Sequence, residues 1–119
     1  MYHKDLEVYK QSISLVKYIY EITNKYPKEE TFGLISQMKR AVISIPSNIA
    51  EGNARFSDKE TLHFVDIALG SIAELDTQLD ISKELGYISD ESYKNGIEIM
   101  KKVQALLIGL RKYLKNKED

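Results

Sequence analysis

Apolar residues in this 119-residue chain recur at intervals of three and four, the spacing that places side chains on one face of an α-helix. No segment alternates apolar and polar residues for long enough to form a β-strand. The pattern predicts helices at about residues 5–26, 28–52, 58–85 and 90–115, joined by short connections that favour antiparallel neighbours. We therefore expect an all-α fold, an antiparallel up-down four-helix bundle, as a single domain over residues 1–119.

Residues near the expected helix ends support these boundaries. Pro27 suits the first turn of a helix. Ser57 and Glu60 have the spacing of a capping box, and Ser89 is a preferred N-cap residue. Gly52 can adopt the left-handed conformation that closes a helix, so we expect the second helix to end there.

The composition is that of an ordinary globular domain, with 43% hydrophobic and 29% charged residues. The absence of cysteine excludes disulfide bonds and thiolate metal sites. No apolar run approaches the ~20 residues that a membrane-spanning helix needs. Residues 1–5 lack the apolar core of a signal peptide. These features predict a cytoplasmic protein without membrane association.

Pro46 lies in the interior of the second expected helix. It removes one backbone hydrogen bond and crowds the carbonyl group of Val42, so we expect a kink. Arg40, Asn48 and Glu51 form a polar cluster away from the apolar face. The cluster is either a ligand or partner site, or a network that holds the kink and the neighbouring helices; we favour the network, because buried polar groups need partners in any case. The predicted structural motif comprises Arg40, Pro46, Asn48, Glu51 and Gly52.

The first expected helix carries two apolar stripes. One consists of Leu6, Tyr9, Ile13, Val16 and Tyr20. The other consists of Leu15, Ile19, Ile22 and Tyr26. The stripes lie more than ~90° apart around the helix, so one core contact cannot bury both. We predict that the stripe from Leu15 to Tyr26 is the interface of a homo-oligomer; the alternative is a helix deeply buried within its own domain.

Residues suited to catalysis or metal binding are few. Glu60 and His63 form Glu-x-x-His, which is half of the ligand set of a di-iron bundle, but no second copy exists. His3 is the only other histidine, so hydrolytic triads lack candidates as well. Glycine-rich phosphate loops are absent. The sequence predicts that the chain is not an enzyme and takes no metal, cofactor or small-molecule substrate.

Charge is balanced at −1 but unevenly placed along the chain. Residues 58–84 contain seven acidic side chains and two lysines, whereas residues 101–117 contain six basic side chains and no acidic one. Helical spacing places Lys94, Lys101, Lys112 and Lys115 within a sector of ~60° on the fourth helix. These lysines, together with Arg111, are either a surface that binds nucleic-acid phosphates or a solvated face with cations favourably placed near a helix C-terminus.

Five segments, in order along nearly the whole chain, carry a family resemblance. They read DLEVY (5–9), GLISQMKRA (33–41), SIPSNIAEG (44–52), FVDIALGS (64–71) and EL (74–75). With them the chain resembles the four-helix-bundle proteins encoded by intervening sequences in bacterial 23S ribosomal RNA genes. That family is similar to the accessory variability protein of diversity-generating retroelements, a barrel-like homopentamer that works with a reverse transcriptase and nucleic acid. The resemblance implies a four-helix bundle, a homopentamer and contact with RNA or DNA, but no enzymatic activity.

Two functions fit the sequence. One is a non-enzymatic oligomeric adaptor for RNA or a nucleoprotein complex, and the other is a protein–protein scaffold with no nucleic-acid role. The net charge of −1 argues against strong nucleic-acid binding by one subunit. A cyclic oligomer would repeat the basic surface around one axis and so strengthen binding. Salt-dependent binding to RNA would distinguish the two functions.

Overall fold

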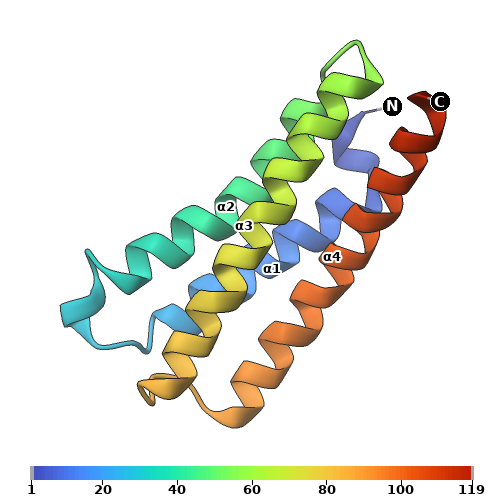
Figure 1. Cartoon of the computed structure of the whole chain (residues 1–119). Helices are drawn as coiled ribbons and strands as arrows, with labels where there is room; N and C mark the ends of the chain where they lie inside the picture. Colours follow the sequence, from blue (N-terminus) through green and yellow to red (C-terminus); the bar gives the residue numbers. More distant parts are fainter. Residues whose placement is uncertain (1, 119) are drawn as a thin grey trace.

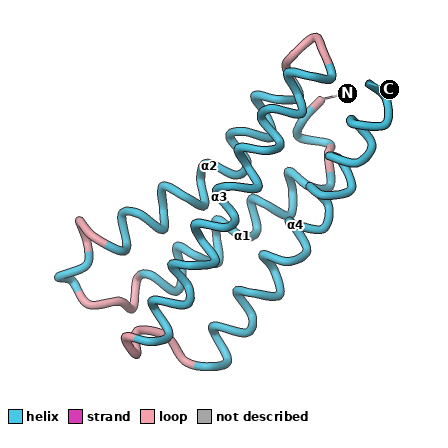
Figure 2. Tube along the Cα trace, viewed as in Figure 1, coloured by secondary structure: helices cyan, strands magenta, loops and turns pink. Residues whose placement is uncertain are grey.

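The computed structural model describes residues 2–118, apart from the side chain of Glu118. Four long helices make up most of this part of the chain, and two short 3-10 turns, η1 (His3–Asp5) and η2 (Lys28–Glu30), precede the first two. No described residue forms a β-strand. Figures 1 and 2 show the helices running alternately up and down with short connections between them. The helices are α1 (Glu7–Thr23), α2 (Leu34–Asn53), α3 (Asp58–Glu84) and α4 (Asp90–Glu118).

Each helix packs against two others in a closed ring. Helix α2 contacts α1 and α3, while α4 contacts α3 and α1. Between residues 2 and 118, no backbone contact joins α1 to α3 or α2 to α4. The bundle measures 47 × 23 × 21 Å. The predicted all-α, antiparallel four-helix bundle is therefore confirmed. None of the described helices has the length and apolar character needed to cross a membrane.

The core is built from one apolar stripe of each helix. The buried side chains of α2, α3 and α4 follow the spacing of three and four residues seen in the sequence, and they include Met38, Val42, Ile45, Val65, Ile72, Leu75, Leu79, Met100, Val103 and Leu107. Full burial of such a side chain contributes about 1.5–3 kcal/mol to the free energy of unfolding. Burial of the apolar stripe that each helix carries therefore stabilises the bundle.

The starts of α3 and α4 are capped as the sequence predicts. Ser57 Oγ accepts a hydrogen bond from the Glu60 backbone N–H at 3.2 Å, and Ser89 Oγ accepts one from the Ser92 N–H at 3.1 Å. After α3, Gly86 has a φ of 75°, which is the left-handed conformation that allows the chain to turn.

The second helix begins later than predicted. Residues 28–33 form η2 and a turn, and α2 begins at Leu34. Glu30 explains this start, because its Oε1 atom accepts a hydrogen bond from the Leu34 N–H at 3.2 Å. Its Oε2 atom accepts one from the Tyr87 hydroxyl at 2.8 Å, and this bond raises the pKa of Tyr87. One carboxylate thus caps α2 and joins it to the connection between α3 and α4.

Gly52 does not close α2 in the left-handed conformation, so that prediction was wrong. The helix continues to Asn53, and the φ of Gly52 is not positive. A Cβ atom at this position would lie 3.0 Å from Phe64 Cβ and 3.3 Å from the Thr61 carbonyl oxygen. Thr61 Oγ1 also donates a hydrogen bond to the Gly52 carbonyl at 2.8 Å. Gly52 therefore allows α2 and α3 to approach closely.

Two glycine substitutions test this packing. We expect Gly52→Ala to lower the free energy of unfolding by about 1–3 kcal/mol, because neither Phe64 Cβ nor a backbone oxygen can swing aside. Gly70→Ala should raise it by about 0.5–1 kcal/mol, since this exposed glycine lies within α3 and, apart from its chain neighbours and the backbone of its own helix, no described atom falls within 4 Å of an added Cβ. Urea unfolding of both variants measures the difference. Equal shifts would contradict the close approach at Gly52.

Candidate nucleic-acid and subunit interfaces

Helix α4 presents an exposed row of cations, here called the α4 lysine strip. It consists of Lys94, Lys101, Lys112 and Lys115. All four side chains are exposed, and none forms an ion pair with another of the side chains that the structure describes, those of residues 2–117. The strip therefore carries positive charge that no described ion pair neutralises, and the exposed Glu98 lies one helical turn from both Lys94 and Lys101.

Arg111, unlike the four lysines, forms an ion pair with another helix. Its Nε donates a hydrogen bond to Asp66 Oδ1 on α3 at 2.7 Å. Lys117 lies 3.4 Å from Asp58 Oδ2, also on α3, and this contact raises the pKa of the lysine. Such partly exposed pairs contribute little to stability, because solvent screens their attraction. They do reduce the charge available to a phosphate, so Arg111 is a weaker binding candidate than the four lysines.

The edge of α3 that faces α4 is acidic for a structural reason. Asp80 accepts a hydrogen bond from the Tyr93 hydroxyl, which raises the pKa of Tyr93. Asp66 binds Arg111 on the same pair of helices. Part of the uneven charge seen in the sequence is therefore used to join α3 to α4.

The predicted subunit interface on α1 was wrong. Leu15 and Ile19 are 0% exposed, and Ile22 and Tyr26 are also buried within the bundle. The Tyr26 ring packs 5.4 Å from that of Tyr87, measured between ring centroids, and burial raises the pKa of Tyr26. This stripe is the core face of α1, so it is not available to another copy of the chain.

The other stripe of α1 lies at the edge of the bundle: Leu6, Tyr9 and Val16 are partly buried against the core, whereas Ile13 and Tyr20 are exposed. Ile13 is 44% exposed, and Ile43 of α2 is 42% exposed. Between the two helices lies a shallow groove of about 330 Å³, here called the α1–α2 groove. It is lined by Tyr9, Ile13, Val16, Ile43, Pro46, Ser47 and Ala50. Sequence reasoning missed Ile43, although its seven-residue spacing from Ala50 places both on one face of α2.

The predicted structural motif of α2 separates into distinct contacts. Asn48 Nδ2 donates hydrogen bonds to the Ser44 carbonyl at 2.8 Å and to Ser44 Oγ at 2.9 Å. Ser44 Oγ in turn lies 2.7 Å from Ser71 Oγ on α3, a partner that sequence reasoning missed. Glu51 instead pairs with Arg55, one turn further along, at 2.9 Å.

The cluster of Arg40, Asn48 and Glu51 is therefore not one network. Arg40 is exposed and joins neither the Asn48 contacts nor the Glu51 pair. Helix α2 continues without interruption through Pro46, which lines the α1–α2 groove. The kink stays a prediction.

Glu60 and His63 lie on the outer surface of α3. Glu60 Oε2 accepts a hydrogen bond at 3.1 Å from Ser57 Oγ, the same atom that caps α3. The His63 ring packs against Phe64 with 5.6 Å between centroids. In the part of the chain that the structure describes, no group of three or more His, Cys, Asp or Glu side chains is placed to hold a metal ion.

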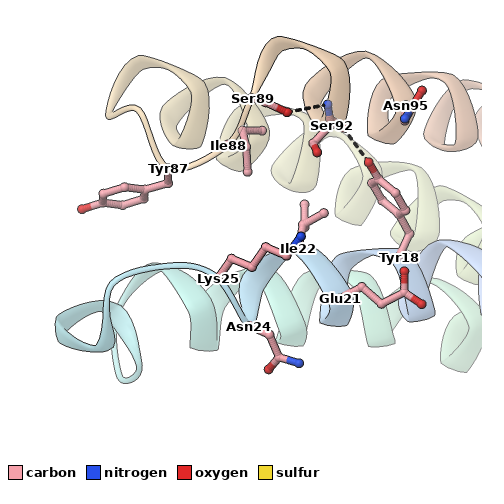
Figure 3. A pocket seen from close by; sticks show the side chains of 10 residues that line it. All are labelled: Tyr18, Glu21, Ile22, Asn24, Lys25, Tyr87, Ile88, Ser89, Ser92 and Asn95. Carbon is pink, nitrogen blue, oxygen red and sulfur yellow. Dashed lines mark hydrogen bonds between the residues drawn. The ribbon is translucent and has the colours of Figure 1, made fainter.

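A larger hollow, of about 780 Å³, opens between the end of α1 and the start of α4 (Figure 3). The Tyr18 hydroxyl reaches across it and donates a hydrogen bond to the Ser92 carbonyl at 2.8 Å. Glu21 and Lys25 are its charged lining residues. The other side chains around the hollow supply hydroxyls, amides and apolar groups. The bond to the Ser92 carbonyl gives Tyr18 a structural role, because it joins α1 to α4.

These features define a small helical-bundle protein whose candidate sites are exposed surfaces of its helices. Residues 4–109 match the 23S rRNA-intervening sequence protein family, and the chain belongs to this family. It is similar to a crystal structure of a protein with unknown function from the S23 ribosomal protein family of Bacteroides thetaiotaomicron VPI-5482. That similarity has a TM-score of 0.83 at 24% identity and covers 94% of this chain and 99% of the other, which shows a shared fold. No curated protein matches the chain.

The two stripes of α1 can be compared by matched substitutions. We expect the double variant Ile19→Glu with Ile22→Glu to lose the fold, because it places carboxylates in the core, at a cost of more than about 4 kcal/mol. Ile13→Glu with Ile43→Glu changes two exposed positions and should keep the helical content. Circular dichroism during thermal unfolding measures both. Cooperative unfolding of the first variant at the wild-type temperature would contradict the assignment of the core face.

Proposed function

We propose that this chain is a non-enzymatic, oligomeric helical-bundle protein that binds RNA or a nucleoprotein complex. The α4 lysine strip is the phosphate-binding surface. The observation that carries the proposal is the exposure of four lysines along one helix without an ion pair to another described residue. Lysines that neutralise phosphates release the counterions of the nucleic acid, which provides binding energy without sequence preference.

Assembly is the second part of the proposal. One subunit has a net charge of −1, so four lysines give it only weak affinity. Several strips around one axis would bind together and raise the overall affinity. The α1–α2 groove supports assembly, because Ile13 and Ile43 remain exposed beside it. The family resemblance implies five subunits.

The groove and the strip belong to different helices. The groove lies between α1 and α2, whereas the strip lies on α4. A subunit contact through the groove therefore leaves the strip available. The second candidate function is a protein–protein scaffold with no nucleic-acid role, which is favoured by the same groove and requires no lysine strip.

The assembly is tested by light scattering. We expect the wild-type chain to be an oligomer at micromolar concentration. Ile13→Glu with Ile43→Glu should yield smaller species with unchanged helicity, because two carboxylates in each groove would repel and would be costly to bury. A monomeric wild-type chain, or an oligomer that both substitutions leave intact, would contradict an interface at the groove.

Nucleic-acid binding is tested by fluorescence anisotropy with RNA and duplex DNA. Wild-type affinity should fall at least ~10-fold between roughly 50 and 200 mM salt, because counterion release weakens as salt rises. Changing Lys101, Lys112 and Lys115 to glutamate should abolish binding and leave the oligomer intact.

The control variant carries the same change of charge elsewhere. Its substitutions are Lys25→Glu, Lys28→Glu and Lys83→Glu, at exposed positions outside α4. It should keep at least about a third of the wild-type affinity, since only the long-range field changes. Equal losses in both variants would count against the strip as the binding surface. Absence of any binding at tens of micromolar protein would favour the scaffold.

A further inference from the structure

The connection between α2 and α3 carries a cluster of aromatic and cationic side chains that the lysine strip does not include. We call it the α2–α3 tip, and it consists of Arg55, Phe56, Lys59, Glu60, His63 and Phe64. Phe56 is fully exposed. The other five residues of the tip line a hollow of about 470 Å³.

Contacts within the tip fix one of its planar groups. The Arg55 guanidinium lies over the Phe64 ring, 4.7 Å from the centroid. Glu51 holds the same guanidinium at 2.9 Å. His63 packs against Phe64 with its ring tilted by 72°. The Arg55 guanidinium lies over the Phe64 ring, and the next residue, Phe56, exposes its whole ring among the described residues, so its faces are available to another flat group.

The tip lies at the same end of the bundle as the C-terminal part of the lysine strip. Lys117 of α4 contacts Asp58 at the start of α3, and Arg111 contacts Asp66 two turns later. Spacings of four and three residues place Lys59, His63 and Asp66 on one side of α3. Figure 1 shows the α2–α3 connection and the end of α4 together at one end of the bundle.

The charges of the tip nearly cancel. Arg55 is paired with Glu51, and the carboxylate of Glu60 lies in the same hollow as Lys59. We therefore expect Lys112 and Lys115 to attract the phosphates, and the aromatic rings of the tip to stack on the bases. Single-stranded nucleic acid has this combination of requirements, because its phosphates need cations and its unpaired bases stack on aromatic side chains.

We propose that the α2–α3 tip is a base-stacking site for single-stranded nucleic acid, with Phe56 as the stacking platform. The inference rests on the proposed function, because the α4 lysine strip supplies the phosphate contacts. A base-paired duplex keeps its bases stacked on one another, so it gains nothing from Phe56. The tip therefore gives the chain a preference for unpaired strands.

The test compares a fluorescein-labelled oligouridylate of roughly 12 nucleotides with an RNA duplex of the same length. Phe56→Ala should weaken single-strand binding roughly tenfold, the usual loss for one stacked base, and leave duplex binding unchanged. The slope of affinity against salt should stay as in wild type, since no charge is removed. The chain has no tryptophan, so Phe56→Trp introduces a single tryptophan, whose fluorescence bound oligouridylate should quench.

Phe32 provides a matched control, because it is also almost fully exposed and lies in the connection between α1 and α2 at the other end of the bundle. Phe32→Ala should bind both strands as wild type does, and Phe32→Trp should not be quenched. Wild-type single-strand affinity in Phe56→Ala, an equal loss in Phe32→Ala, or unquenched Phe56→Trp would overturn the stacking site alone. A wild-type chain that binds neither strand would overturn the proposed function together with the stacking site.

Discussion

Burial of one face of each helix at the centre of a four-membered ring governs the rest of this structure. Leu15 and Ile19 of α1 fill that centre and have no exposed surface. Because a helix in such a ring turns only part of its circumference inward, the other stripe of α1 must face the groove and the solvent. The same constraint turns the lysines of α4 outward, since Met100, Val103 and Leu107 occupy its inner face. The surfaces available for function are thus a consequence of the core.

Contacts between α3 and its neighbours use polar residues that would otherwise suggest binding sites. Asp66 and Asp80 bond to Arg111 and Tyr93 of α4. On the other side, Ser71 bonds to Ser44 of α2. These groups hold α3 in place, so a reading of charge along the sequence overestimates how many of them are free to bind a partner. The lysines of the α4 lysine strip form no such contact with the described side chains, so the proposed function rests on them.

Local patterns predicted the fold well and the surfaces less well. Spacing of three and four identified the inner faces of α2, α3 and α4, and the Ser57 and Ser89 caps needed only neighbouring residues. Which of the two stripes of α1 faces the core depends on how α1 is rotated about its own axis within the ring. The local sequence pattern does not determine this rotation. Glu30 bonds to Tyr87, 57 positions away, and Arg111 to Asp66, 45 positions away. Such partners are set by packing between helices, so periodicity alone did not find them.

The proposed surfaces are compatible in one assembly because they occupy different sides of the bundle. The α1–α2 groove belongs to one pair of neighbouring helices, while the lysine strip and most of the α2–α3 tip belong to α4 and α3. Contact between copies through the groove would therefore repeat the strip, and with it the tip, once per subunit. Since each copy adds both cations and a ring face, an oligomer gains affinity for a long unpaired strand faster than for a short one. Under the proposed function, strand length, more than base sequence, would then determine which nucleic acid such an assembly retains.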